Sequence, residues 1–416
     1  MRSVPRSDQL ICCWEALDGS LARLLPDIMG QLIRRESHSQ QDGCEAEVAL
    51  YLKGLLTEAG CETSLREVAP GRPNVLGVIG DASSGPTLMI NCHMDTVPGG
   101  NWQGPDAGPY EAVIRDGRVY GRGAADVKGS IAGAVLAIKA LSSTGAEIPG
   151  RVVFAGVTGE EGSTSNGTHE LLRNGPIPDM AIVCEPSDLG IYVSQKGSTN
   201  FNVGFAGKAA HSSRPELGVN AIDAAARFLL LHHASYGSRV GITVDPLLGP
   251  ATLAPVGVSG GGRGDTIPDR CSVKLNCRYP SIVHPEEVEA YLKDTAAEIS
   301  RTAKVGCEVS RETRTVQWRF QDKPSFEALP FTTPLDSPLV TSLVHSIVEV
   351  RGKEPAIMGA TFWSDAGLIS GVAGVPAVVF GPGDISVAHA PVEYVEIAQV
   401  LDMAKILVHF ILSQGA

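Results

Sequence analysis

Short apolar segments that end abruptly in an imidazole or a carboxylate constrain the fold of this chain more than any other feature. Three segments share this pattern: Thr87–Cys92 before His93, Arg151–Val157 before Glu160, and Ala181–Cys184 before Glu185. Segments that are apolar throughout are typical of strands buried on both faces of a sheet. Because reactive groups gather beyond the carboxyl ends of parallel strands, we expect the three polar side chains to meet at one sheet edge.

Helical patterns alternate with these strands. Apolar residues recur at helical spacing in residues 8–35, Glu45–Ala59, Gly129–Leu141, Ser337–Val350 and the closing segment Tyr394–Leu412. Further buried strands are expected at Asn74–Ile79 and Val375–Phe380. The alternation predicts an α/β fold in which a mostly parallel mixed sheet is flanked by helices.

The pattern changes after residue 196. Strands and helices then follow in a β-α-β-β-α-β order, at Thr199–Phe205, Val219–Ala234, Thr252–Ser259, Cys271–Tyr279, Pro285–Thr302 and Glu308–Thr315. This order predicts a compact four-stranded sheet with both helices on one face. We therefore predict a first domain formed by residues 1–196 and 318–416, with a smaller α+β domain inserted at residues 197–317.

Composition excludes several classes of function. The chain has 416 residues, which favours two domains over a single core. A net charge of −12 argues against nucleic acid or an anionic membrane as a partner, because both require clustered Lys and Arg. No stretch has the length of a membrane span, and we expect no signal peptide. Nine cysteines without a C-x-x-C pair indicate free thiols in a reducing cytoplasm.

The first strand-end histidine has a carboxylate two residues away. On a strand, the side chains of His93 and Asp95 would face the same side. A carboxylate that binds a metal-ligating histidine fixes its tautomer and orientation, but a buried His–Asp pair is also a common structural pair. This segment alone leaves both interpretations open. Collecting the polar residues at strand ends and in loops gives His93, Asp95, Asp126, Glu160, Glu161, Glu185 and His389.

Six ordered motifs contain or accompany these residues: HMDTVP, GRGAADVKG, TGEEG, CEP, HSSRP and GPG…AHAPVEYV. Together they resemble the metal-dependent acyl-amino-acid deacylase and exopeptidase family, which contains acetylornithine deacetylase, succinyl-diaminopimelate desuccinylase, aminoacylase and glutamate carboxypeptidase. The resemblance extends from about residue 20 to the end of the chain. It implies that residues 1–196 and 318–416 are the catalytic domain, and that residues 197–317 are a lid or dimerisation domain.

The resemblance also implies a pair of divalent metal ions, with zinc expected and cobalt as the alternative. Asp126 would bridge both ions. His93 and Glu185 would complete one site, and Glu161 and His389 would complete the other, which leaves a position for water at each ion.

The remaining two carboxylates receive other roles by resemblance. Glu160 matches the general base, which takes a proton from the water and later hands it to the leaving amine. Asp95 matches the partner that orients His93. Adjacent side chains point in different directions, so one of Glu160 and Glu161 can bind metal while the other faces the substrate. The residues themselves do not decide which.

In the inserted domain, the resemblance implies contacts with the substrate. His211 matches a histidine that helps to bind the oxyanion of the tetrahedral intermediate, often from the partner subunit; the alternative is a surface histidine beside a helix start. Arg278 matches a position that holds the carboxylate of the substrate; the alternative is a solvated arginine. Two departures, Asp265 for the usual Asn and Trp363 for a small residue, predict a changed substrate pocket.

These features predict a cytoplasmic enzyme that hydrolyses the amide bond of an N-acylated amino acid or a related small metabolite. The deacetylase and desuccinylase branch matches best, in HSSRPELGVNAI and FGPGDISVAHAPVEYV. Relatives also imply a homodimer through the inserted domain. One alternative is a di- or tripeptide exopeptidase with the same metal core. Another is a catalytically inactive binding protein, which the intact set of ligands and base disfavours.

Overall fold

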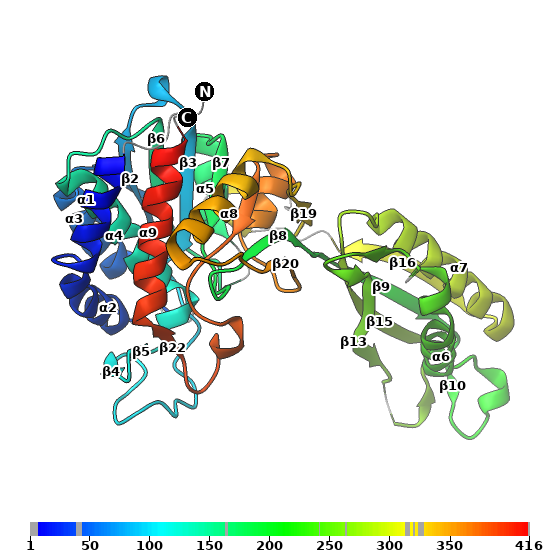
Figure 1. Cartoon of the computed structure of the whole chain (residues 1–416). Coiled ribbons are helices and arrows are strands. Elements are labelled where there is room, and N and C mark those ends of the chain that lie inside the picture. The colour runs from blue at the N-terminus through cyan, green and yellow to red at the C-terminus, as the bar shows by residue number, and fades with distance from the viewer. Residues whose placement is uncertain are drawn as a thin grey trace. The chain divides into compact units, whose positions relative to one another are not determined.

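Two compact units make up the chain (Figure 1). The computed structural model describes residues 7–38, 44–162, 165–240, 242–262, 264–312, 317–318, 321–322 and 328–414. The first unit consists of Met1–Val193, Thr333–Met358 and Ser364–Ala416, and the second consists of Ser194–Thr332 and Gly359–Trp363. Each unit has a hydrophobic core of its own.

A nine-stranded sheet contains the apolar segments of the first unit. Its order is β1-β2-β6-β3-β7-β21-β8-β19, and β20 pairs with β8. The strands are β1 (Glu62–Ala69), β2 (Arg72–Gly80), β3 (Thr87–His93), β6 (Arg151–Val157), β7 (Met180–Val183), β8 (Ile191–Gln195), β19 (Phe331–Thr332), β20 (Ile357–Ala360) and β21 (Ala377–Val379). The predicted mixed α/β sheet is confirmed, but it is not mostly parallel: the central pairs β6–β3, β3–β7 and β7–β21 are parallel, whereas β1–β2, β2–β6, β21–β8 and β8–β19 are antiparallel.

The central strands end at one common edge. His93, the last residue of β3, is paired with Val157, the last residue of β6. On the other side of β3, Asn91 is paired with Val183, and the amide of Cys184 donates to the main-chain oxygen of Asn91. The segments that follow these three strands therefore leave the sheet side by side, as the apolar pattern predicts.

Seven α-helices accompany the sheet in the part of the first unit that the structure describes. They are α1 (Ser7–Asp18), α2 (Leu25–Arg34), α3 (Ala46–Glu58), α4 (Gly129–Ser143), α5 (Asn166–Asn174), α8 (Pro338–Arg351) and α9 (Ile397–Ser413). Helix α9 contacts α1, α4 and α8, and Figure 1 shows it in red across the face of the sheet. Helices α1, α4, α8 and α9 therefore form one connected layer, whereas α5 lies on the other face of β3, where Asn91 donates to Thr168 of α5.

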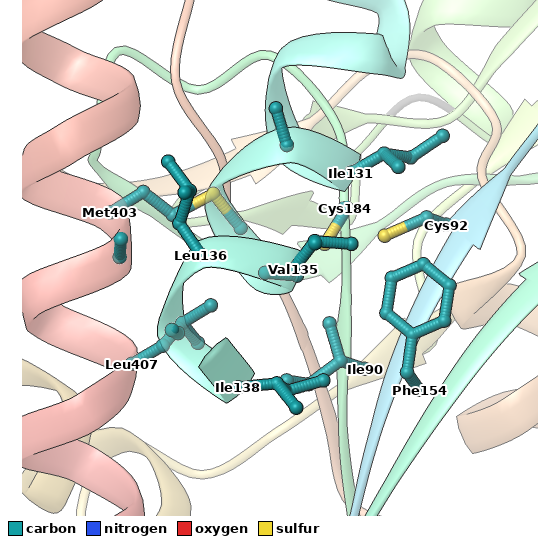
Figure 2. Close-up of a cluster of buried hydrophobic side chains, with 14 of the residues drawn as sticks. Ile90, Cys92, Ile131, Val135, Leu136, Ile138, Phe154, Cys184, Met403 and Leu407 are labelled. Carbon is teal, nitrogen blue, oxygen red and sulfur yellow. The ribbon is translucent and has the colours of Figure 1, made fainter. Parts of the chain in front are cut away.

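Helix α4 is buried along nearly its whole length because it lies between α9 and the sheet. Figure 2 shows the side chains that fill this layer, from the sheet (Ile90, Cys92, Phe154 and Cys184), from α4 (Ile131, Val135, Leu136 and Ile138) and from α9 (Met403 and Leu407). Helix α9 comes close to α4 at Gly133, because a Cβ added to this glycine would lie 3.1 Å from the sulfur of Met403. Each large apolar side chain buried here contributes about 1.5–3 kcal/mol, which fixes the strands that carry the polar ends.

Some predicted boundaries differ from the structure. The helical pattern of residues 8–35 is divided into α1, a short 3₁₀ turn (Ala22–Leu24) and α2, because Pro26 starts a new helix at its first turn. The predicted closing helix begins as strand β22 (Tyr394–Glu396), which joins β4 (Val113–Arg115) and β5 (Arg118–Tyr120) in a small sheet. This small sheet brings the C-terminal segment beside the loop that precedes α4.

The second unit contains an antiparallel sheet in the order β13-β15-β9-β16. Its strands and helices are β9 (Gly197–Ala206), α6 (Ala221–Arg239), β13 (Thr252–Gly260), β15 (Arg270–Tyr279), α7 (Pro285–Ala303) and β16 (Gly306–Glu312). Both helices pack on the sheet through the second core. Residues 313–315, the end of the last predicted strand, lie outside the described residues.

Three two-stranded ribbons complete the second unit, and they pair β10 (Ala210–His211) with β14 (Thr266–Ile267), β11 (Val244–Asp245) with β12 (Gly249–Pro250), and β17 (Gln317–Trp318) with β18 (Gln321–Asp322). Throughout the described ranges, we find no helix with both the length and the apolar character needed to cross a membrane.

Candidate metal centre and active site

A buried carboxylate, Asp126, lies between two imidazoles. Its Oδ1 is 3.0 Å from His93 Nε2, and its Oδ2 is 3.2 Å from His389 Nε2. Two more carboxylates flank the pair: Glu185 Oε1 lies 3.8 Å from His93 Nε2, and Glu161 Oε1 lies 3.0 Å from His389 Nε2. The structure thus gathers the five side chains proposed as ligands from five separate segments of the first unit.

The ring of His93 is oriented by a main-chain oxygen. Its Nδ1 lies 2.8 Å from the carbonyl oxygen of Asp95, which can only accept, so Nδ1–H donates and Nε2 is directed toward Asp126. The carboxylate of Asp95 is farther away, with Oδ1 at 3.7 Å from Nδ1. The expectation that this carboxylate orients His93 is therefore corrected, because the backbone of the same residue makes the bond.

The carboxylate of Asp95 organises a different loop. Its Oδ1 accepts the amide hydrogens of Gly159 (3.2 Å) and Glu160 (3.1 Å), and its Oδ2 accepts that of Glu161 (3.0 Å). The loop can wrap around one residue because Gly159 adopts a φ of +84°, which side chains disfavour. Burial raises the pKa of Asp95 to about 7, although the positive charge of His93 opposes this shift.

The adjacent carboxylates Glu160 and Glu161 have different surroundings, and their separate roles stay a prediction. Among the described residues, the ligand atoms that all lie within 4.8 Å of one another belong to His93, Asp126 and Glu161, whereas Glu160, Glu185 and His389 are outside this set. Burial raises the pKa of Glu160 well above its ordinary value, and the charges of Asp365, Glu161 and Asp95 act in the same direction, against His93. A carboxylate that holds a proton more readily than usual suits acid–base chemistry.

The charges of the centre fit a metal site. Hydrogen bonds to Asp126 and Glu161 raise the pKa of His389 to about 10. Burial disfavours the charged form of His93, but the neighbouring carboxylates favour that form more strongly. They hold the pKa of His93 well above its ordinary value. Burial and the nearby Asp126 raise the pKa of Glu185. Carboxylate oxygens and imidazole nitrogens crowded in this way are the donor set that zinc and similar divalent ions take.

Two buried carboxylates near the centre have no role in the sequence analysis. Thr168 Oγ1 donates to Asp365 Oδ2 at 2.5 Å, and Asn91 Nδ2 donates to Thr168 Oγ1 at 3.0 Å, which links β3, α5 and the segment after β20. The second carboxylate, Glu393, accepts amide hydrogens from the loop of Asp126. Glu393 lies inside the motif AHAPVEYV, which could have drawn attention to it, whereas the only signal for Asp365 is a charge among apolar neighbours.

The four residues proposed to contact substrate belong to the second unit. His211 and Thr266 are paired across the β10–β14 ribbon, and the amide of Ser212 donates to the main-chain oxygen of Asp265 at 2.8 Å. His211 and Asp265 are therefore neighbours and both are exposed.

The two other residues of this group lie elsewhere in the second unit. Arg278 is on β15, where its Nε donates to Asn276 Oδ1 at 3.1 Å. Trp363 is half-buried in the short segment that follows β20. Contacts of any of these four residues with a substrate stay a prediction.

Comparison with known proteins agrees with the geometry of the centre. The model of peptidase family M20/M25/M40 matches residues 89–413. The N-formyl-4-amino-5-aminomethyl-2-methylpyrimidine deformylase of Bacillus subtilis (strain 168) is 28% identical over 390 residues, covering 87% of this chain and 88% of that protein. A protein named "Probable succinyl-diaminopimelate desuccinylase" from Staphylococcus epidermidis (strain ATCC 35984) is 27% identical over 399 residues, covering 90% and 92%.

The fold has a counterpart among solved structures. Aminopeptidase PepT of Bacillus cereus ATCC 10987 superposes with a TM-score of 0.74 at 21% identity, covering 95% of this chain and 99% of that chain. The family match spans most of the sequence and includes all five candidate ligands and Glu160. From this match and the buried centre of carboxylates and imidazoles, we conclude that the chain belongs to peptidase family M20/M25/M40.

Proposed function

We propose that this hydrolase uses two divalent metal ions, zinc or cobalt, to cleave the amide bond of an N-acylated amino acid or a related small metabolite. The observation that carries the proposal is the placement of Asp126, whose two oxygens face different imidazoles, at 3.0 and 3.2 Å. A carboxylate with one oxygen directed to each side suits two ions. His93 and Glu185 would hold one of them, and Glu161 and His389 the other.

The chemistry divides between the metals and one side chain. Two divalent ions acidify a bound water and polarise the carbonyl of the substrate. Glu160 lies on the same loop as Glu161, and in this proposal its carboxylate would take the proton of the water. Its raised pKa matches a group that must first accept this proton and then release it to the leaving amine near neutral pH.

The names of the two curated relatives support a small acyl group as the part removed. One is named as a deformylase and the other as a desuccinylase, and both names describe removal of a short acyl group from nitrogen. A di- or tripeptide exopeptidase is the second candidate, because the family itself is described as a peptidase family.

We also propose that the second unit supplies specificity. The exposed His211 would bind the oxyanion, and its neighbour Asp265 would favour a cationic group on the substrate. Arg278 would hold a substrate carboxylate, a task suited to a planar guanidinium, and Trp363 would form an apolar wall. The pairing of β10 with β14 supports a joint action of His211 and Asp265, because it holds their loops together.

A homodimer through the second unit is part of the proposal. Strand β13 is an edge of its sheet, and it exposes Val256 and Val258. Exposed apolar edge strands pair readily with another strand. Sedimentation of the purified chain should give twice the monomer mass of 43.6 kDa, and Val258→Lys should shift the equilibrium toward monomer. A monomeric wild-type protein would contradict this part.

Release of free amine from a defined panel tests the proposed function. The zinc- or cobalt-loaded protein is assayed with N-formyl, N-acetyl, N-succinyl and N-carbamoyl amino acids, and in parallel with free di- and tripeptides. We expect turnover of one acyl series and little turnover of the peptides. Turnover of peptides alone would favour the exopeptidase, and a metal-loaded protein that releases no amine from any compound would refute the proposal.

A further inference from the structure

A buried ion pair, Arg122–Glu393, lies beside the metal centre and outside the proposed ligand set. Glu393 is 1% exposed and precedes β22. Its Oε2 accepts from Arg122 Nη1 at 2.6 Å and from the amide of Gly123 at 2.9 Å. Its Oε1 accepts from the amides of Ala125 at 3.0 Å and Asp126 at 3.1 Å. One carboxylate therefore binds three amides of the loop that carries the central ligand.

This arrangement repeats the one around Asp95. The loop of Glu160 and Glu161 wraps its amides around the carboxylate of Asp95, and the loop of Asp126 wraps its amides around Glu393. Consecutive amide hydrogens in a turn form a concave site for an anion, and bonds to an ionised acceptor are about twice as strong as neutral ones. Each ligand-bearing loop thus has a buried carboxylate at its centre.

Arg122 links Glu393 to the loop that carries His389. Arg122 Nη2 donates to the main-chain oxygen of Ala390 at 3.2 Å, directly after His389, and its Nε donates to that of Pro98 at 3.2 Å. His389 itself has a φ of +60°, a conformation that costs a non-glycine residue about 1 kcal/mol or more unless neighbours impose it. The ion pair therefore connects the amide of Asp126 with the carbonyl of Ala390, the residue after His389.

We propose that Glu393, together with Arg122, is a positioning residue that sets the metal-binding geometry by holding the Asp126 loop and the His389 loop in one hydrogen-bonded unit. The inference rests on the proposed function, in which Asp126 bridges two ions. Glu393 contacts neither the ions nor the substrate in this role. It acts through the amide of Asp126, whose side chain must present one oxygen to each side.

Glu393→Gln tests the proposal with nearly unchanged shape. The amide group keeps one acceptor oxygen, so its NH₂ must face either Arg122 and Gly123 or Ala125 and Asp126, and two of the four hydrogen bonds lose their acceptor. Zinc affinity is measured by competition with a chromophoric chelator. We expect two equivalents bound by the wild type, and at least one of them bound tenfold or more weakly by the variant. At saturating zinc, kcat should fall while KM stays within about twofold.

Two further variants keep the test decisive. Glu396→Gln is the matched control, because Glu396 lies three residues later in β22 and pairs with Arg118 in solvent, so its zinc affinity should equal that of the wild type. If Glu393→Gln does not fold, Arg122→Lys replaces it, since lysine keeps the charge but cannot reach Glu393, Ala390 and Pro98 together. The same weakening of zinc is expected.

Two outcomes would overturn the inference without touching the proposed function. In one, the wild type binds two equivalents of zinc, and Glu393→Gln binds them equally well at an unchanged melting temperature. In the other, the variant melts at lower temperature but keeps wild-type zinc affinity and kcat, which means that Glu393 serves only stability. If the wild type itself does not bind two equivalents, the proposed function fails and the inference fails with it.

Discussion

Metal binding should release protons from the two imidazoles of the centre. Both ring nitrogens of His93 lie against oxygen acceptors, at 2.8 Å from the carbonyl of Asp95 and 3.0 Å from Asp126 Oδ1, so the metal-free ring carries two N–H groups. His389 Nε2 lies within 3.2 Å of Asp126 and Glu161, and these carboxylates raise its pKa to about 10. A metal ion binds only the neutral ring, so at pH 7 each ion must displace a proton.

The number of displaced protons determines how steeply zinc affinity depends on pH. Each displaced proton makes the affinity rise about tenfold per pH unit, so the product of the two zinc binding constants should rise about a hundredfold per unit between pH 6 and pH 8. Zinc affinity should rise with pH, because below the raised pKa values protons compete with zinc for the imidazole nitrogens. Any proton held by Glu185, whose pKa burial also raises, adds to the count.

A pH indicator in weakly buffered solution measures the release directly when zinc is added to metal-free protein. We expect at least two protons for two ions, and one fewer for His389→Ala. His284→Ala removes an exposed imidazole that does not cap α7 through its side chain, and this variant should release as many protons as the wild type. Fewer than one proton in total, with an affinity independent of pH, would refute the reasoning.

Two further predictions concern the first unit. Phe154→Ala should lower the free energy of unfolding by about 3–5 kcal/mol, because Phe154 is fully buried between β6 and α4, whereas Ile177→Ala, at an exposed position, should change it little in urea unfolding. Burial lowers the pKa of His169 to about 4, so the unfolded chain binds the proton more readily. Stability should therefore fall by about 2 kcal/mol from pH 7 to pH 5, and His169→Gln should remove this part of the pH dependence in the same measurement.

The positions of the strand-end ligands were predictable because burial on both faces requires an unbroken apolar segment. His93 and Glu185 each interrupt such a segment, so the interruption marks the edge of the sheet. Strand β1 was missed for the opposite reason. It is an edge strand with charged residues on its solvent side, and its sequence contains no apolar run that would predict a strand.

The support of the ligands was not predictable from local pattern. Glu393 is 267 residues away from Asp126, and apart from Arg122 its partners are main-chain amides, which every residue type except proline carries. Asp95 was noticed, but spacing on an ideal strand pointed its carboxylate at His93. The chain leaves the strand after His93, and the carboxylate turns to the Glu160 loop instead. Long-range contacts with backbone groups do not change the hydrophobic periodicity of the sequence, so that periodicity cannot predict them.

The separate roles of Glu160 and Glu161 are the central claim, and turnover of zinc-loaded Glu160→Gln tests it most directly. If Glu160 is the base and not a ligand, the variant should keep two equivalents of zinc and lose about 10²- to 10⁴-fold in kcat. Glu161→Gln should instead lose zinc, since Glu161 faces His389. Near-wild-type kcat in Glu160→Gln with zinc bound would contradict the assignment of the base.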